Sequence, residues 1–310
     1  MPYLGELAAV ATAISWAVSG IAFGVATRAV GGFATNHFRI WAAWPLLASI
    51  VWFATGSLWP SGLDGERGGL LLLSGLIGMV IGDVGYFHAL ATIGPRLASV
   101  IMASWPLVAI LCGPLGGDRF RLDNLPGALV TVAGVVLVLW CSRGGSAWNP
   151  NMTRRQWWGG TLGALIASCG QAIGVLLSRR AMAASPELPA GIDPLAATLV
   201  RVTAGVIGMQ LFAMLQRRPL AGLSVTRQRR PFSGAMIGTV LGPVLGVWMS
   251  MLATRHCADV GTGAALMATA PLFMLPLAWF AYGSRIGPGA LVGTLLTVAG
   301  AAWLMTTAAA

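Results

Sequence analysis

The chain contains no lysine, and all 19 of its basic residues are arginines. A Walker A phosphate loop and a retinal Schiff base both require a lysine, so both kinds of site are excluded. Cysteine and histidine are scarce, and no C-x-x-C pair or H-E-x-x-H motif occurs among the 4 cysteines and 3 histidines. We therefore predict no disulfide, no metal site and no cofactor. A polytopic membrane enzyme stays open as an alternative class, although no Ser-His-Asp arrangement supports it.

Charge of either sign is also sparse. Charged residues make up 9% of the 310 residues, hydrophobic residues make up 56%, and the mean hydropathy is +0.78. A soluble domain cannot bury so much apolar surface, so the sequence predicts an all-α polytopic membrane protein. The net charge of +10 would favour nucleic acid as the partner of a soluble protein, but most arginines here fall between apolar runs. We expect them to anchor loops and contact anionic lipid headgroups, with no nucleic-acid partner.

Two stretches of the chain each recur, in similar form, later in the sequence. Met102-Ala-Ser-Trp-Pro-Leu107 returns as Met267-Ala-Thr-Ala-Pro-Leu272, an offset of 165 residues. Gly127-Ala-Leu-Val-Thr-Val-Ala-Gly134 returns as Gly293-Thr-Leu-Leu-Thr-Val-Ala-Gly300 with six of eight residues kept, an offset of 166 residues. Two matches in the same order at nearly one offset indicate two copies of a unit of about 150 residues.

The number of spans predicts how the two copies are oriented. A transmembrane helix needs about 20 mainly apolar residues. Between breaks rich in glycine, proline or charge, this length predicts ten spans: 4–27, 34–55, 69–91, 97–116, 124–141, 159–178, 194–215, 232–254, 260–282 and 287–307. Because five spans is an odd number, the second copy enters the membrane the other way up. We expect two inverted five-helix repeats, residues 1–150 and 151–310.

An arginine recurs near the start of the second span of each repeat, in Arg39-Ile-Trp-Ala-Ala43 and Arg201-Val-Thr-Ala-Gly205. Each lies five to seven residues inside its span. That depth is roughly 8–10 Å by helical rise, so either side chain can snorkel to the membrane surface. We interpret both arginines as structural anchors, with binding of a substrate carboxylate as the alternative.

Pro106 and Pro271 occupy matching positions inside spans four and nine. Each proline removes a backbone donor and so frees a carbonyl near mid-membrane. We predict hinges at both prolines, while ordinary tolerance of proline in membrane helices is the alternative.

These features together resemble the EamA-type transporters of the drug/metabolite transporter superfamily. The resemblance rests on the two five-span repeats, the early arginines, the mid-span prolines and the G-x-L-x-x-x-A-G helix that follows a charged turn. The family's small-Gly-acid turn is present as Gly116-Gly117-Asp118-Arg119, but Ser284-Arg285 stands at the matching place in the second half. The resemblance implies a secondary transporter of small metabolites, commonly an exporter of amino acids or related compounds.

Asp83 lies about three residues past the middle of the third span. That places it roughly 5 Å from the bilayer centre, where a carboxylate is costly and normally faces a cavity or a partner. In one interpretation Asp83 titrates or holds a substrate amine. In the other it is permanently paired, with Arg39 or nearby hydroxyls. Tyr86 and Phe87 share its helical face, whereas His88 is turned away.

Aromatic residues inside the spans predict the walls of a substrate site. Trp16, Trp105 and Trp248 lie inside spans one, four and eight, and Gln171 takes the place of Trp16 when the first helices are aligned. Such a site suits neutral or zwitterionic substrates with an apolar body, although packing is the alternative role of each tryptophan. The predicted substrate-binding residues are Trp16, Asp83, Tyr86, Trp105, Gln171 and Trp248.

We therefore expect an alternating-access carrier rather than an enzyme, one that exports amino acids or related zwitterions. Hydrophobic cations or drugs are the alternative substrates. The expected partners are a small-molecule substrate, membrane lipids and protons as the coupling ion, and the expected location is the bacterial inner membrane.

Charge and resemblance disagree on the orientation of the chain. Outside Arg39 and Arg201, eleven arginines follow odd-numbered spans and six follow even-numbered spans. The positive-inside rule then puts both termini outside the cytoplasm. The family resemblance implies the reverse, with both termini inside.

Overall fold

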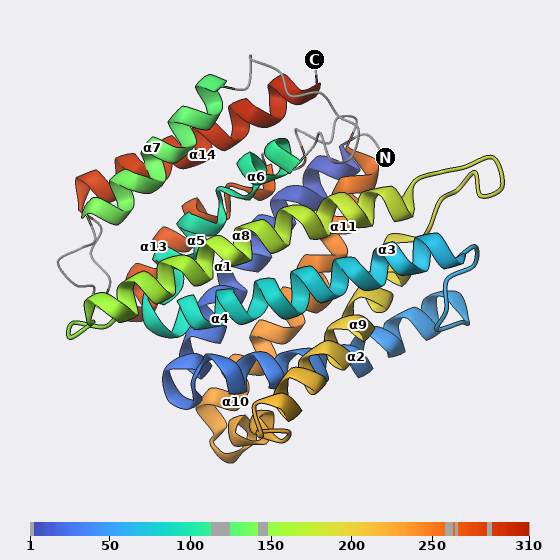
Figure 1. The fold of residues 1–310 in the computed structure, drawn as a ribbon, viewed down its shortest axis with the longest axis horizontal. Coiled ribbons are helices and arrows are strands. Elements are labelled where there is room, and N and C mark those ends of the chain that lie inside the picture. Colours follow the sequence, from blue (N-terminus) through green and yellow to red (C-terminus); the bar gives the residue numbers. More distant parts are fainter. Residues whose placement is uncertain are drawn as a thin grey trace.

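The computed structural model describes residues 3–112, 125–141, 148–257, 263, 266–283 and 287–309. Within these ranges the regular elements are helices, and most of them run as long, slanted rods packed side by side (Figure 1). Six helices are long and apolar enough to cross a membrane: Leu4–Val30, Gly32–Thr55, Gly65–Thr92, Arg154–Met182, Pro194–Leu215 and Arg229–His256. Shorter apolar helices cover Pro126–Cys141, Ala270–Tyr282 and Pro288–Trp303. The chain is an all-helical multi-pass membrane protein, as the sequence predicted.

The helices fall into two series that follow one another along the chain. The first series comprises α1 (Leu4–Val30), α2 (Gly32–Thr55), α3 (Gly65–Gly75), the π-helical η1 (Leu76–Gly82), α4 (Asp83–Thr92), α5 (Gly94–Met102), α6 (Trp105–Cys112) and α7 (Leu125–Cys141). The second comprises α8 (Arg154–Met182), α9 (Pro194–Leu215), the 3₁₀-helical η4 (Ala221–Arg227), α10 (Arg229–Thr239), the π-helical η5 (Val240–Gly246), α11 (Val247–His256), α13 (Ala270–Tyr282) and α14 (Pro288–Ala309).

Polar side chains in the breaks define where several helices start. The Asp64 carboxylate accepts the N–H of Arg67 at the start of α3. Asp193 caps α9, whose first residue, Pro194, has no N–H to satisfy. Thr153 and the side chain of Gln156 form a capping box at the start of α8. These local signals explain why the sequence located the spans closely, with α9 starting at residue 194 as predicted.

A wide π-helical turn interrupts the third long helix of each series at the same place. η1 starts at residue 76 and α4 at residue 83, while η5 starts at residue 240 and α11 at residue 247, so both elements recur 164 residues later. Glycines recur with them, Gly78 and Gly82 in η1 and Gly242 and Gly246 in η5. The two turns lie inside the predicted spans 69–91 and 232–254. π-Helical turns inside α-helices are rare and are found mostly at functional sites.

Spans four and nine are broken rather than bent. α5 ends at Met102 and α6 begins at Trp105, so Pro106 is the second residue of a new helix. Pro271 is likewise the second residue of α13, after a turn at residues 268 and 269. A proline is tolerated in the first turn of a helix because its missing N–H would have no partner there. The chain therefore leaves the helical conformation just before each proline.

Glycines bring the two series into close contact. A Cβ atom on Gly85 of α4 would lie 2.4 Å from the carbonyl oxygen of Gly163 on α8. A Cβ on Gly234 of α10 would lie 2.7 Å from the carbonyl oxygen of Ala22 on α1. Helix α4 thus packs on the first helix of the second series, and α10 packs on the first helix of the first series. The two halves exchange equivalent contacts.

Candidate functional site

A cavity of about 110 Å³ lies among helices from both series. Its lining comes from α1, α2, η1, α4, α5, α6, α8, α9, η5, α11 and α13. Five of the six predicted substrate-binding residues line this one cavity: Trp16, Asp83, Tyr86, Trp105 and Gln171. Both predicted anchors, Arg39 and Arg201, and one predicted hinge, Pro271, also line it. Residues far apart in the sequence therefore converge at the centre of the bundle.

Trp248 does not belong to this lining, contrary to its predicted place. On α11 the cavity-lining residues are Val247 and Ser250. Trp248 follows Val247 directly, so its side chain is rotated about 100° away around the helix. It packs instead against the buried cluster that includes Ile40 and Leu199. Pro106 is also outside the lining, although its neighbour Trp105 belongs to it.

Asp83 forms an ion pair with Arg39. The Arg39 side chain is 8% exposed and the Asp83 side chain is 18% exposed, so the pair is largely removed from solvent. The guanidinium carbon of Arg39 also lies 5.2 Å from the centre of the Phe87 ring, a cation–π contact. The structure thus pairs Asp83 with Arg39 and places both in the cavity wall.

Arg201 is buried in the same wall without such a partner. Only 3% of its surface is exposed, and Nη1 lies 3.4 Å from Sδ of Met251. Nε makes no hydrogen bond, and in the described part of the chain no carboxylate lies within ion-pair distance of the guanidinium. The cavity therefore contains two guanidinium groups and one carboxylate.

Aromatic side chains form much of the remaining wall. The Tyr86 hydroxyl lies against α1, 3.2 Å from where a Cβ on Gly20 would stand. Trp16 packs on the glycine at position 246 of η5, where a Cβ would lie 2.7 Å from the indole ring. Trp105 is 3% exposed at the start of α6. His88, as predicted from its place on α4, is exposed and outside the lining.

Comparison with known proteins identifies the family. The model of the EamA-like transporter family matches residues 3–140 and, a second time, residues 158–306. The chain belongs to the EamA-like transporter family. A solved crystal structure of a protein with 21% sequence identity has a TM-score of 0.65, and the alignment covers 98% of this chain and 97% of the other, so the two share a fold. No curated protein matches. The resemblance seen in the sequence is confirmed.

In this family member the cavity walls and the buried arginine repeat, whereas the acidic residue does not. Met102 and Ala103 line the cavity at the break in span four, and Met267 and Ala268 line it at the break in span nine. The η1 and η5 segments also contribute matching positions. None of these wall positions was among the predicted substrate-binding residues. The glycine spacing that spans three and eight share is the sequence signal that points to them.

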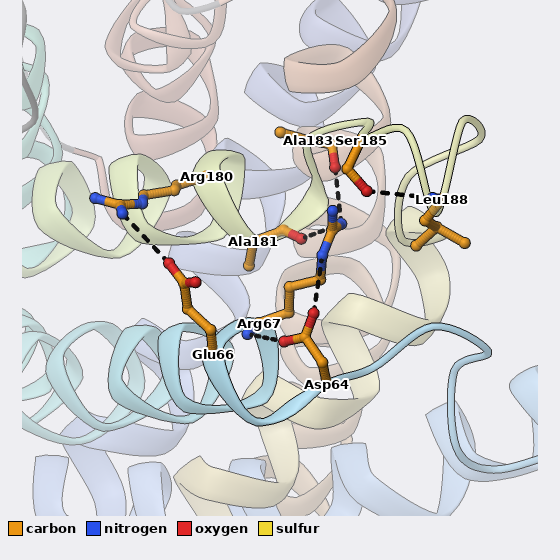
Figure 2. Close-up of polar contacts among 8 residues, drawn as sticks. All are labelled: Asp64, Glu66, Arg67, Arg180, Ala181, Ala183, Ser185 and Leu188. Carbon is orange, nitrogen blue, oxygen red and sulfur yellow. Dashed lines mark hydrogen bonds and ion pairs between the residues drawn. The ribbon is translucent and has the colours of Figure 1, made fainter.

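Polar contacts join the two series at one end of the EamA-like bundle (Figure 2). Nη1 of Arg67, on α3, donates to the carbonyl oxygens of Ala181 and Ala183, 3.2 and 2.7 Å away. Arg180 on α8 pairs with Glu66 on α3 at 3.3 Å, with both side chains exposed. These contacts tie α3 to the end of α8 and to the residue that follows it.

The opposite end of the bundle has a second network. Arg28 near the end of α1 donates to the carbonyl oxygen of Trp148 at 3.1 Å, and its guanidinium lies 4.9 Å from the centre of that indole ring. The Tyr282 hydroxyl donates to the carbonyl oxygen of Ile21 at 2.6 Å and its ring packs edge-on against Trp148. Trp148 is buried because these side chains enclose it.

Proposed function

We propose that this chain is a secondary active transporter that exports small metabolites across the bacterial inner membrane by alternating access. Its substrates are amino acids or related zwitterions, which have an apolar body and both signs of charge. The observation that carries the proposal is the central cavity between the two series of helices, with aromatic walls, an Arg39–Asp83 pair and the buried cation of Arg201. Membership of a transporter family supports transport over catalysis.

The proposed topology has ten spans in two inverted repeats, residues 1–150 and 151–310. Six long helices supply six spans. The pair α5 and α6, helix α7, helix α13 with the turn before it, and helix α14 supply the other four. The exchanged contacts of α4 with α8 and of α1 with α10 are those expected of a twofold relation between inverted repeats.

Alternating access follows from the two end networks and the central breaks. Release of the Arg67 and Arg180 contacts opens one end, and release of the Arg28 and Tyr282 contacts opens the other. The breaks before Pro106 and Pro271 serve as the points where spans four and nine bend.

Protons are the proposed coupling ion, with Asp83 as their site. Protonation of Asp83 cancels its charge and releases Arg39 from the ion pair, which changes the packing of α2 against α4. A substrate ammonium group competes for the same carboxylate. Exchange of the two ligands at one site is the simplest basis for coupled transport.

Counterflow in proteoliposomes tests the proposal. Purified protein is reconstituted with a high internal concentration of each unlabelled amino acid, and entry of the same labelled compound is followed without ATP. We expect transient accumulation of at least one amino acid. Exchange of organic cations alone would favour the hydrophobic-cation alternative, and no exchange of any compound would contradict the proposed function.

A further inference from the structure

Arg201 is the one buried cation in the described cavity wall that forms no ion pair with a carboxylate of the protein; the nearby Asp83 is paired with Arg39. Its exposed fraction is 3%, its Nε has no hydrogen-bond partner, and among the described residues its guanidinium hydrogen-bonds only to the Met251 sulfur, 3.4 Å away. A buried charge normally has a partner, because desolvation is costly. An anion bound in the cavity would supply the missing partner of the guanidinium.

The internal repeat explains why Arg201 lacks a partner. Arg39 and Arg201 begin equivalent motifs in the second spans of the two halves. Arg39 is paired with Asp83, the first residue of α4. The first residue of α11, in the equivalent place after the π-helical turn, is Val247. The second half thus keeps the arginine but has an aliphatic residue where the first half has the acid.

The surroundings of Arg201 leave its guanidinium accessible from the cavity. Nη2 would lie 3.4 Å from a Cβ on Gly78 and 3.3 Å from a Cβ on Gly174, so glycines of η1 and α8 provide the space that the guanidinium occupies. Met251 contacts the side chain from α11, one helical turn after Val247. Arg201, Gly78 and Val247 all line the cavity.

From these observations we propose that Arg201 binds the carboxylate of the transported substrate and thereby selects carboxylate-bearing metabolites. The proposal rests on the transport function above and adds the group that the substrate must carry. A guanidinium offers paired N–H donors that match a carboxylate, and the contact is strengthened by charge. The wall holds two guanidinium groups and one carboxylate, so its net positive charge disfavours a purely cationic ligand.

Four variants isolate this contact. Arg201→Gln removes the charge, and Arg201→Lys keeps the charge without the planar fork. Val247→Asp recreates in the second half the Arg39–Asp83 pair of the first, so that a carboxylate of the protein itself pairs with Arg201. Val247→Asn is the matched control, because it has nearly the same size and polarity without the charge.

The probes are leucine and three analogues that differ in charged groups: 4-methylpentanoate lacks the amine, leucinamide lacks the carboxylate, and isopentylamine has only the amine. Binding is followed as thermal stabilisation of the detergent-purified protein and as competition in leucine counterflow. We expect the two carboxylates to bind wild type at least about tenfold better than leucinamide. Arg201→Gln and Val247→Asp should lose that preference, Val247→Asn should retain it, and Arg201→Lys should weaken it.

The two readouts separate failure of this proposal from failure of the proposed function. Exchange of leucine by wild type with an unchanged carboxylate preference in Arg201→Gln would overturn the role of Arg201 while leaving transport intact. Stabilisation by carboxylates that depends on Arg201, without any counterflow, would support the binding site and contradict transport. If carboxylates and leucinamide stabilise wild type equally, the proposal is wrong.

Discussion

Replacement of Asp83 by Asn is the substitution that the structure predicts most fully. It removes the negative partner of Arg39 and leaves a guanidinium whose side chain is only 8% exposed. Removing one member of a buried ion pair costs about 3–5 kcal/mol. Asp83 keeps 18% of its side-chain surface exposed. Arg39 also keeps its contact with Phe87, so we expect the lower end of the range, about 3 kcal/mol.

A double-mutant cycle turns this estimate into a test. Arg39→Met, Asp83→Asn and the double variant that carries both substitutions are compared with wild type by unfolding in detergent. Each single variant should be destabilised, whereas the double variant should recover most of the loss because no buried charge remains. Additive losses in the double variant would refute the coupling that the structure implies.

The same substitution tests the proposed proton site. Asp83→Asn should abolish accumulation of substrate driven by a pH gradient while counterflow, which needs no coupling ion, continues. The variant must insert and purify like wild type for the comparison to hold. Unchanged, proton-responsive uptake in Asp83→Asn would show that the residue serves packing alone.

Three further predictions follow from the cavity wall, the helix contacts and the loops. Trp105→Ala should weaken apparent substrate affinity by about tenfold or less without changing expression, since it removes an aromatic face that contributes ~1–2 kcal/mol to holding an ammonium group. Tyr86→Phe keeps its aromatic face and removes a hydroxyl from the cavity wall, so its effect should reflect the lost hydroxyl contact and not exceed about tenfold. Normal affinity in both variants would contradict the position of the site. Gly85→Ala should lower the melting temperature because its Cβ would stand 2.4 Å from a carbonyl oxygen, whereas Gly69→Ala, with nothing within 4 Å, should not, and equal effects would refute close packing of α4 on α8. A cysteine introduced at Ala310 in a chain without native cysteines should react with an impermeant thiol reagent added outside intact cells, as the arginine distribution predicts, and labelling only after permeabilisation would favour the family orientation instead.

The sequence was sufficient for the helices because their boundaries are set by local chemistry. Apolar run length located the long helices, and caps such as Asp193 with Pro194 mark their starts. The repeat could be recognised in the sequence because the glycines at its helix contacts cannot be replaced by larger residues. A Cβ on Gly134 would stand 2.4 Å from the backbone nitrogen of Thr297, and a Cβ on Gly300 would stand 2.4 Å from the backbone nitrogen of Thr131.

The site was only partly predictable, because side-chain direction depends on tertiary packing. Asp83 and Tyr86 could be placed on one helix face by their spacing, and both line the cavity. Trp248 was chosen for its depth alone, yet one residue along α11 is enough to turn it away from the wall. The difference between Arg39 and Arg201 needed the structure, which pairs Asp83 of α4 with Arg39 and places Val247 at the equivalent position of α11.

The central claim is that the cavity between the two halves is reached alternately from the two sides of the membrane. A single cysteine at Met102, a half-buried lining position, in a chain without native cysteines tests this most directly. Inside-out and right-side-out vesicles are treated with an impermeant thiol reagent, with and without a substrate found by counterflow. Labelling from both sides, slowed in each case by the substrate, is the predicted result. Labelling from one side only, or at a rate that the substrate does not change, would contradict the account.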